Sequence, residues 1–312
     1  MRQTALQTVY QLAKKDPRVV FVGSDLGSGT LKEMRNEFPE RFYMEGISEQ
    51  HILGFAAGLA KEGYLPYLNT IATFFARRAY EQIAIDVALH NLPVRILASG
   101  GGMVYAPLGP THTAIEDLSL MLSIPNLKVF APADANEMRN LLEASIGDSS
   151  PWYIRFGKGG EAKVTAEVQD KPWTPKIFGA RKPKYTVITT GVTLHPALGV
   201  LNQYPELELA VIHIPFLNEI RLELWKDRVL NSERILVVEE HVPRGGLFTQ
   251  ILHEFYKFNL SCRNFIHLSL PNNFSHKYGS QDDHFRYNGF DTEGIRSALL
   301  KEEFREKIKY GN

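Results

Sequence analysis

The chain contains the stretch Gly46-Ile47-Ser48-Glu49-Gln50-His51, followed by the small-residue run Gly54-Phe55-Ala56-Ala57-Gly58-Leu59-Ala60. This pattern predicts a closely packed helix with Glu49 at its beginning. Burial disfavours the charged form of a carboxyl group and so raises its pKa. An acid whose pKa lies near neutrality is suited to proton transfer. We therefore expect Glu49 to be a chemically active carboxyl group.

Short apolar runs alternate with amphipathic helical segments on both sides of this stretch. The run at 19–25 is apolar and ends in turn residues, as a buried strand does. Further strands are expected at 64–70, 94–98, 127–130 and 152–156, and helices at 78–90 and 135–146. Such alternation predicts an α/β fold with a mainly parallel sheet.

The pattern is interrupted at 161–184, which is rich in proline and lysine and is interpreted as a linker. Strands are then expected at 185–190, 208–214 and 234–240, and helices at 194–202, 247–258 and 292–309. A chain of 312 residues exceeds one core of typical size. We predict two domains, 1–160 and 185–312, each a mainly parallel sheet flanked by helices.

The composition favours small-molecule chemistry. The chain has 35 basic and 35 acidic side chains and no long basic run, which argues against nucleic acid or an anionic membrane as the main partner. A single cysteine, Cys262, excludes an intrachain disulfide framework. The first residues lack the apolar core of a signal peptide. We therefore expect a cytoplasmic protein.

Further signals follow Glu49 in a fixed order. They are Tyr64-Leu65-Pro66-Tyr67, the segment 73–82, Gly109-Pro110-Thr111-His112, and Pro132-Ala133-Asp134 with Glu137. Together they resemble the pyrimidine-binding domain of transketolase, and the segment 237–246 resembles the C-terminal domain of that family. The resemblance spans nearly the whole chain.

The resemblance implies a thiamine diphosphate site. In that family the glutamate of Gly-Ile-x-Glu bonds the aminopyrimidine ring, where a protonated carboxyl favours the imino form that deprotonates the thiazolium carbon. This role falls on Glu49, and the stacking aromatic falls on Phe74. The alternatives are a helix-cap glutamate and a core aromatic.

The resemblance also implies substrate contacts. His112 matches a histidine that faces the substrate and stabilises developing charge on oxygen. Arg155 matches the position that holds a sugar phosphate, and Arg77 and Arg78 are candidates for the same anion. The alternative for His112 is a histidine of a surface loop, and each arginine alone is more often a solvated or structural charge.

Two further residues are candidate cofactor contacts. Tyr80 matches a family position. Asp25 follows the first predicted strand, at the edge where open α/β sheets bind ligands. The alternatives for Asp25 are a subunit contact and a helix cap.

The chain lacks the Gly-Asp-Gly sequence with which the family holds the metal ion of the diphosphate. The resemblance therefore implies a split enzyme and no metal ligand in this chain. The expected partner is an N-terminal transketolase-like subunit that carries the Gly-Asp-Gly motif and Mg²⁺ or a similar ion. The expected assembly is a heterotetramer that shares each thiamine diphosphate across an interface.

Three positions depart from the family pattern. Gly100 and Leu108 stand where transketolase has a histidine and an aspartate that contact donor hydroxyls, and Ile71 replaces a frequent aromatic. A site built to bond hydroxyl groups discriminates strongly by them. The donor is therefore expected to be unusual or less hydroxylated.

The leading hypothesis is the C-terminal subunit of a split transketolase that moves a two-carbon ketol unit between sugar phosphates. The alternative within the superfamily is a pyruvate-using subunit similar to deoxyxylulose-5-phosphate synthase or to the beta subunit of a 2-oxoacid dehydrogenase. Leu108 favours that alternative, whereas His112 and Arg155 favour sugar transfer. A non-catalytic scaffold would not need Glu49 and Phe74 together with His112.

Overall fold

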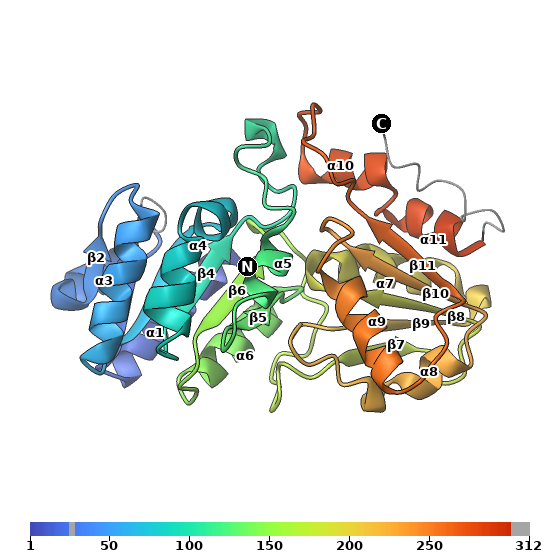
Figure 1. Cartoon of the computed structure of the whole chain (residues 1–312), viewed down its shortest axis with the longest axis horizontal. Helices are drawn as coiled ribbons and strands as arrows, with labels where there is room; N and C mark the ends of the chain where they lie inside the picture. Colours follow the sequence, from blue (N-terminus) through green and yellow to red (C-terminus); the bar gives the residue numbers. More distant parts are fainter. Residues whose placement is uncertain (25–28, 301–312) are drawn as a thin grey trace.

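A computed structural model describes residues 1–24 and 29–300 of the chain. Two domains lie side by side, and each has helices packed on a sheet (Figure 1). The predicted α/β fold with two mainly parallel sheets is confirmed.

The first domain is built on a parallel sheet with the strand order β2-β1-β3-β4-β6-β5. Its strands are β1 Val19–Gly23, β2 Phe42–Met44, β3 Leu65–Ile71, β4 Arg95–Ser99, β5 Lys128–Phe130 and β6 Trp152–Phe156. Every residue of β1, β3, β4 and β6 is buried, as expected for strands covered on both faces. The register pairs Gly23 with Asn69 and Ile71 with Ser99, so the carboxyl ends of these strands share one edge.

Two candidate site residues, Glu49 and Tyr80, lie in the α-helices of this domain. These helices are α1 Arg2–Lys15, α2 Lys32–Glu37, α3 Glu49–Lys61, α4 Tyr80–Gln82, α5 Asp117–Leu122 and α6 Ala135–Ser145. The predicted start of α6 is confirmed, because Asp134 accepts the backbone N–H of Glu137 at 2.9 Å. The helix predicted at 78–90 is not regular: two π-helical segments, Phe74–Arg78 and Ile83–Ala88, flank α4.

The second domain has the strand order β11-β10-β8-β9-β7, and β7 alone runs antiparallel to its neighbour among the described strands. Its strands are β7 Lys176–Gly179, β8 Tyr185–Thr189, β9 Leu209–His213, β10 Arg234–Glu239 and β11 Phe265–Ser269. Its helices are α7 Leu194–Gln203, α8 Lys226–Leu230, α9 Leu247–Lys257, α10 Gln281–Asn288 and α11 Thr292–Leu300.

Three strands differ from the sequence-based expectation. β2 and β11 were not predicted, and β7 lies inside the segment predicted as a linker, 161–184. β2 has 3 residues and β7 has 4, and the residues of β7 are alternately half-buried and exposed at a sheet edge. Such short runs carry little periodicity. The last part of the helix predicted at 292–309 lies outside the described residues.

The two domains are joined through a buried contact. The rings of Phe130 and Phe216 stack with their centroids 4.6 Å apart. Beside them, Glu137 of α6 contacts His213 of β9 and Lys176 of β7, both at 2.9 Å. Hydrophobic and ionic contacts therefore fix the second sheet against the first domain.

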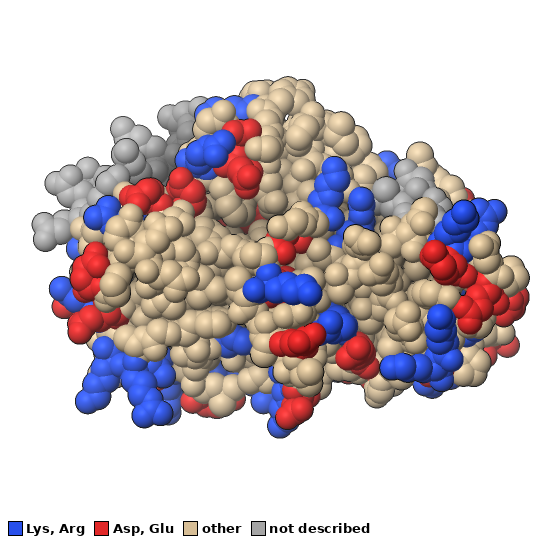
Figure 2. All heavy atoms as spheres, turned by 180° about the vertical axis from the view of Figure 1, so that it is seen from behind, with Lys and Arg blue, Asp and Glu red and all other residues tan. Residues whose placement is uncertain are grey.

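The surface seen from behind carries acidic and basic side chains intermixed, as the neutral composition predicts (Figure 2). Across the described ranges, no helix has both the length and the apolar character needed to cross a membrane.

Candidate active site

Glu49 is the first residue of α3 and is 1% exposed. One carboxylate oxygen, Oε2, accepts a hydrogen bond from Nη1 of Arg78 at 2.6 Å. The other oxygen, Oε1, is buried and has no hydrogen-bond partner among residues 1–24 and 29–300. Buried polar atoms are normally paired, so Oε1 is the kind of atom that a bound ligand would satisfy.

Phe74 and Arg78 come from the π-helical segment Phe74–Arg78, which follows β3 at the carboxyl edge of the sheet. The guanidinium of Arg78 lies over the Phe74 ring, 4.5 Å from its centroid. Phe75, the next residue, is instead fully buried in the core. The π-helical segment thus directs adjacent aromatic side chains to different surroundings, a geometry common at functional sites.

His112 completes a continuous row of side chains. Its ring is 5.3 Å from that of Phe74, centroid to centroid, in an edge-on arrangement of 69°. Its Nδ1 is 2.9 Å from the Thr111 hydroxyl. Glu49, Arg78, Phe74 and His112 therefore lie in sequence across the carboxyl edge of the first sheet.

Arg77 and Arg78, predicted as anion ligands, both bind carboxylates of this chain. Arg78 pairs with Glu49, as described above. Arg77 pairs with Glu116 through two guanidinium nitrogens, and its Nη1 donates to the carbonyl of Pro110 at 3.0 Å. Burial acts to raise the pKa of Glu116, but Arg77 outweighs it and lowers the pKa. Arg77 thus fastens the turn that carries His112.

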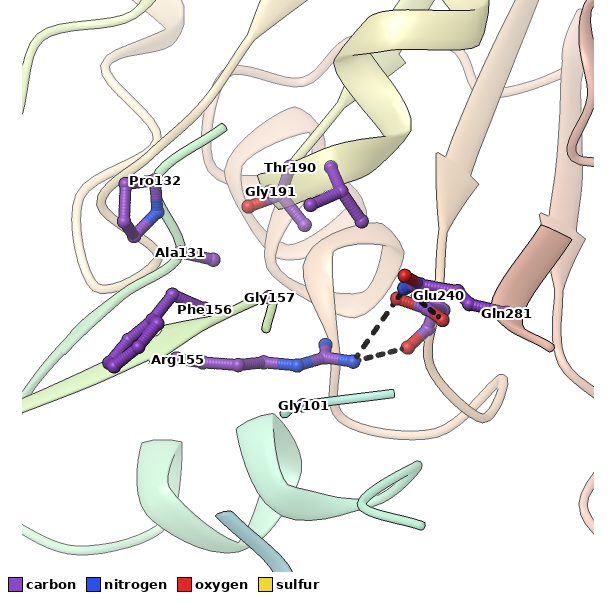
Figure 3. A pocket seen from close by; sticks show the side chains of 11 residues that line it. Gly101, Ala131, Pro132, Arg155, Phe156, Gly157, Thr190, Gly191, Glu240 and Gln281 are labelled. Atoms are coloured by element: carbon purple, nitrogen blue, oxygen red, sulfur yellow. Dashed lines mark hydrogen bonds and ion pairs between the residues drawn. The ribbon is translucent and has the colours of Figure 1, made fainter. Parts of the chain in front are cut away.

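Arg155, predicted to hold a phosphate, lies at the junction of the domains. It is buried, its Nε is 3.5 Å from Asp117, and its Nη2 donates to the backbone carbonyl of Glu240 at 2.7 Å (Figure 3). Burial raises the pKa of the Glu240 carboxyl more than the neighbouring Arg155 lowers it. The structure therefore gives Arg155 partners within this chain, and a phosphate role remains a prediction.

The two candidate cofactor contacts are placed as follows. The hydroxyl of Tyr80 is 2.9 Å from that of Ser123, beside the end of α5. A cofactor contact for Tyr80 stays a prediction. Asp25 lies outside the described residues.

Two of the three departures from the family pattern, Gly100 and Leu108, have structural counterparts. A side chain at Gly100 would lie 2.0 Å from Cε2 of Tyr105, so the Tyr105 ring fills that space. Leu108 is 55% exposed. A phenol and an alkyl group therefore stand where the family has a histidine and an aspartate.

Several residues of the site were not identified from sequence. Glu116 and Tyr105 show no local signal, because their partners Arg77 and Gly100 become neighbours only through the fold. Glu240 belongs to the segment 237–246, whose pattern predicts no role for it. Within the described parts of the chain, no group of three or more His, Cys, Asp or Glu side chains is arranged to hold a metal ion.

Comparison with known families agrees with this geometry. Residues 1–160 match the family model for the transketolase pyrimidine binding domain, and residues 179–295 match that for the transketolase C-terminal domain.

Among curated proteins, the chain is 34% identical over 299 residues to 1-deoxy-D-xylulose-5-phosphate synthase of Syntrophus aciditrophicus. The match covers 94% of this chain and 45% of that protein. It is 31% identical over 312 residues to the enzyme of the same name from Aquifex aeolicus, covering 98% of this chain and 48% of the relative. The chain thus spans about half the length of these relatives.

Among solved structures, the chain resembles a split-gene transketolase described as an inactive β4 tetramer. The TM-score is 0.83 at 26% identity, and the match covers 96% of both chains. A transketolase from Campylobacter jejuni has the same fold, with a TM-score of 0.79 at 21% identity over 96% of this chain and 46% of that one.

Proposed function

This chain belongs to the transketolase family of thiamine diphosphate-dependent enzymes, and from that premise we propose that it is the pyrimidine-binding subunit of a split transketolase. In this proposal it transfers a two-carbon ketol unit between sugar phosphates, and only with a second subunit that binds the diphosphate. The observation that carries the proposal is the buried, unpartnered Oε1 of Glu49 at one end of the row that reaches His112.

The residues fit the aminopyrimidine half of the cofactor. A flat nitrogen heterocycle needs a carboxyl partner in its plane and an aromatic face against it. Glu49 supplies a buried carboxyl oxygen that lacks a partner among the described residues, and Phe74 supplies a half-buried ring. Arg78 joins the two side chains and fixes their relative position.

Each residue has a separate task in the proposed reaction. When bound, thiamine diphosphate supplies the carbanion-stabilising chemistry of ketol transfer. Glu49 is proposed to exchange a proton with the pyrimidine ring through Oε1. Thr111 occupies Nδ1 of His112, so Nε2 is the nitrogen proposed to exchange a proton with a substrate oxygen.

A second subunit is part of the proposal for two reasons. The sequence has no Gly-Asp-Gly motif, and the chain matches a split-gene transketolase over 96% of both chains. We propose that the partner holds the diphosphate and Mg²⁺ or a similar ion, and that the assembly is a heterotetramer.

A second candidate is a pyruvate-using synthase. It is favoured by the curated relatives, which are named 1-deoxy-D-xylulose-5-phosphate synthase, and by Leu108 at a position where transketolase reads a donor hydroxyl. Pyruvate lacks the donor hydroxyl group that transketolase contacts from this position, whereas a ketose phosphate has it.

Reconstitution tests both candidates. The chain is mixed with a Gly-Asp-Gly subunit, thiamine diphosphate and Mg²⁺, and the products from ketose phosphates and from pyruvate are measured by NMR. Ketol transfer from a ketose supports the proposal. Carbon dioxide release from pyruvate with carboligation supports the second candidate, and turnover with neither donor class in a complex that binds the cofactor contradicts both.

A further inference from the structure

A segment of the second domain, residues 271–280, contacts the turn that carries His112. After β11 the chain runs through residues 271–280 without a helix or strand before α10 begins at Gln281 (Figure 1). Within it, Tyr278 is 65% exposed although it contacts the first domain. This segment has no part in the site as derived so far.

Tyr278 packs directly against Gly109. A side chain at Gly109 would lie 3.1 Å from Cε1 and 3.4 Å from the hydroxyl oxygen of Tyr278, so the ring edge occupies the space beside the glycine Cα. Gly109 has a φ of 82°, a conformation that favours glycine. Two features therefore restrict the backbone at Gly109: its positive φ angle and its contact with Tyr278 of the second domain.

Gly109 is connected to His112 through one turn. The carbonyl of Gly109 accepts the backbone N–H of His112 at 3.0 Å. On the first-domain side, Arg77 donates to the carbonyl of Pro110 in the same turn. The turn is therefore contacted from two sides, by Arg77 of the first domain and by Tyr278 of the second domain.

Glu240 anchors both partners of this contact. Its carboxylate accepts hydrogen bonds from Nε2 of Gln281 at 2.8 and 2.9 Å (Figure 3). It also accepts a hydrogen bond from the backbone N–H of Met103 at 2.8 Å. Gln281 lies three residues after Tyr278, and Met103 begins the loop that leads to Gly109. One buried carboxylate thus fixes the segment and the loop relative to each other.

We propose that Tyr278 is a positioning residue for His112, through which the C-terminal domain sets the place of the histidine that faces the substrate. The consequence for catalysis rests on the proposed function, whereas the placement of the turn does not. Tyr278 acts through Gly109 and does not itself exchange a proton. Because a small displacement of a catalytic group costs much rate, loss of the ring should lower turnover more than substrate affinity.

Hydrogen exchange in the full chain tests the placement without any reaction. Tyr278→Ala is expected to speed amide exchange in residues 103–112 about tenfold, because the turn loses its contact with Tyr278 of the second domain. Tyr278→Phe keeps the ring edge and should exchange like the wild type. Phe274→Ala removes an exposed aromatic from the same segment and is the matched control.

Kinetics of the reconstituted complex test the consequence. Tyr278→Ala should lower kcat about tenfold with less than a twofold change in KM for the donor, and Tyr278→Phe should restore kcat. The proposal is overturned, whatever the activity, if amide exchange in residues 103–112 is unchanged in Tyr278→Ala. It is also overturned if Phe274→Ala accelerates that exchange as much as Tyr278→Ala does. If the wild-type complex shows no ketol transfer, the proposed function fails, and the exchange result alone decides whether Tyr278 places the turn.

Discussion

Nη1 of Arg78 lies 2.6 Å from Oε2 of Glu49, at the beginning of α3. The pairing fills one oxygen of a buried carboxylate and leaves the other without a partner among the described residues. Arg78 therefore orients Glu49 so that one oxygen remains for a ligand.

The first prediction concerns the carboxyl group itself. Glu49→Gln keeps the shape of the side chain but cannot transfer the proton, so kcat of the reconstituted complex should fall about a thousandfold. Glu45→Gln, an exposed change a few residues earlier, is the control. Stopped-flow or product-NMR rates check it, and a Glu49→Gln complex with wild-type turnover would refute the mechanism.

The second prediction concerns the coupling of Arg78 to Glu49. Arg78→Met leaves Oε2 of Glu49 buried without its donor and should cost about 1 kcal/mol of stability, a low value because the Arg78 side chain is 45% exposed. In a double-mutant cycle, Arg78→Met should cost less unfolding free energy in the Glu49→Gln background than it costs in the wild type. Urea unfolding of the four proteins measures the coupling, and strict additivity would show that the pair is not an energetic unit.

The third prediction separates two neighbouring phenylalanines. Phe74→Ala should weaken thiamine diphosphate binding by the complex about tenfold with little change in Tm, because its ring is only half-buried and lies beside His112. Phe75→Ala should instead destabilise the fold by about 3 kcal/mol or more, because that ring is fully buried. Calorimetric titration and thermal unfolding distinguish them, and the reverse pattern would place the cofactor elsewhere.

The fourth prediction concerns acid stability. Burial acts to raise the pKa of Glu137, but His213 and Lys176 outweigh it and lower the pKa to about 2, from an ordinary value of 4.5. Because the pKa is lower in the folded chain, the charged carboxylate stabilises the fold above about pH 4.5, and this stabilisation is lost as the pH falls toward 2.

Glu137→Gln tests this pH dependence. The variant should lose about 3 kcal/mol at neutral pH and show a flatter fall in unfolding free energy between pH 4.5 and 2 than the wild type. Glu143→Gln, an exposed change on α6, should retain the wild-type slope. Equal slopes for Glu137→Gln and the wild type would show that Glu137 does not carry the effect.

The fifth prediction concerns assembly. Ile85 and Leu89 are 52% and 64% exposed near α3, and apolar side chains exposed close together are typical of protein interfaces. Ile85→Asp and Leu89→Asp should therefore weaken binding of the partner subunit at least tenfold. Leu230→Asp, an equally exposed apolar position in the second domain, is the control. Unchanged sedimentation of the mixed complex would place the interface elsewhere.

The strands that could be predicted are the ones buried on both faces. β1 is a run of apolar residues and β6 is apolar except for Arg155, so both patterns are explicit in the sequence, and β6 begins and ends where predicted. β7 escaped prediction because an edge strand needs only alternate burial and takes its partner, β9, from a distant part of the chain.

The candidate site was predictable in residue types and less so in contacts. Glu49, Phe74 and His112 belong to local motifs, and the fold brings them into one row. The partners of the arginines were not predictable, because no sequence spacing links Arg77 to Glu116 or Arg155 to Glu240. Such pairs are set by how the elements pack, which the local pattern does not encode.

The ionic contacts between the domains have a consequence for unfolding. Glu137 with His213, and Arg155 with Glu240, are buried pairs whose members belong to different domains. Separating the domains would break these pairs and would also expose the stacked rings of Phe130 and Phe216 to water, which is unfavourable. The two domains should therefore melt together, in one cooperative transition whose calorimetric and van't Hoff enthalpies agree.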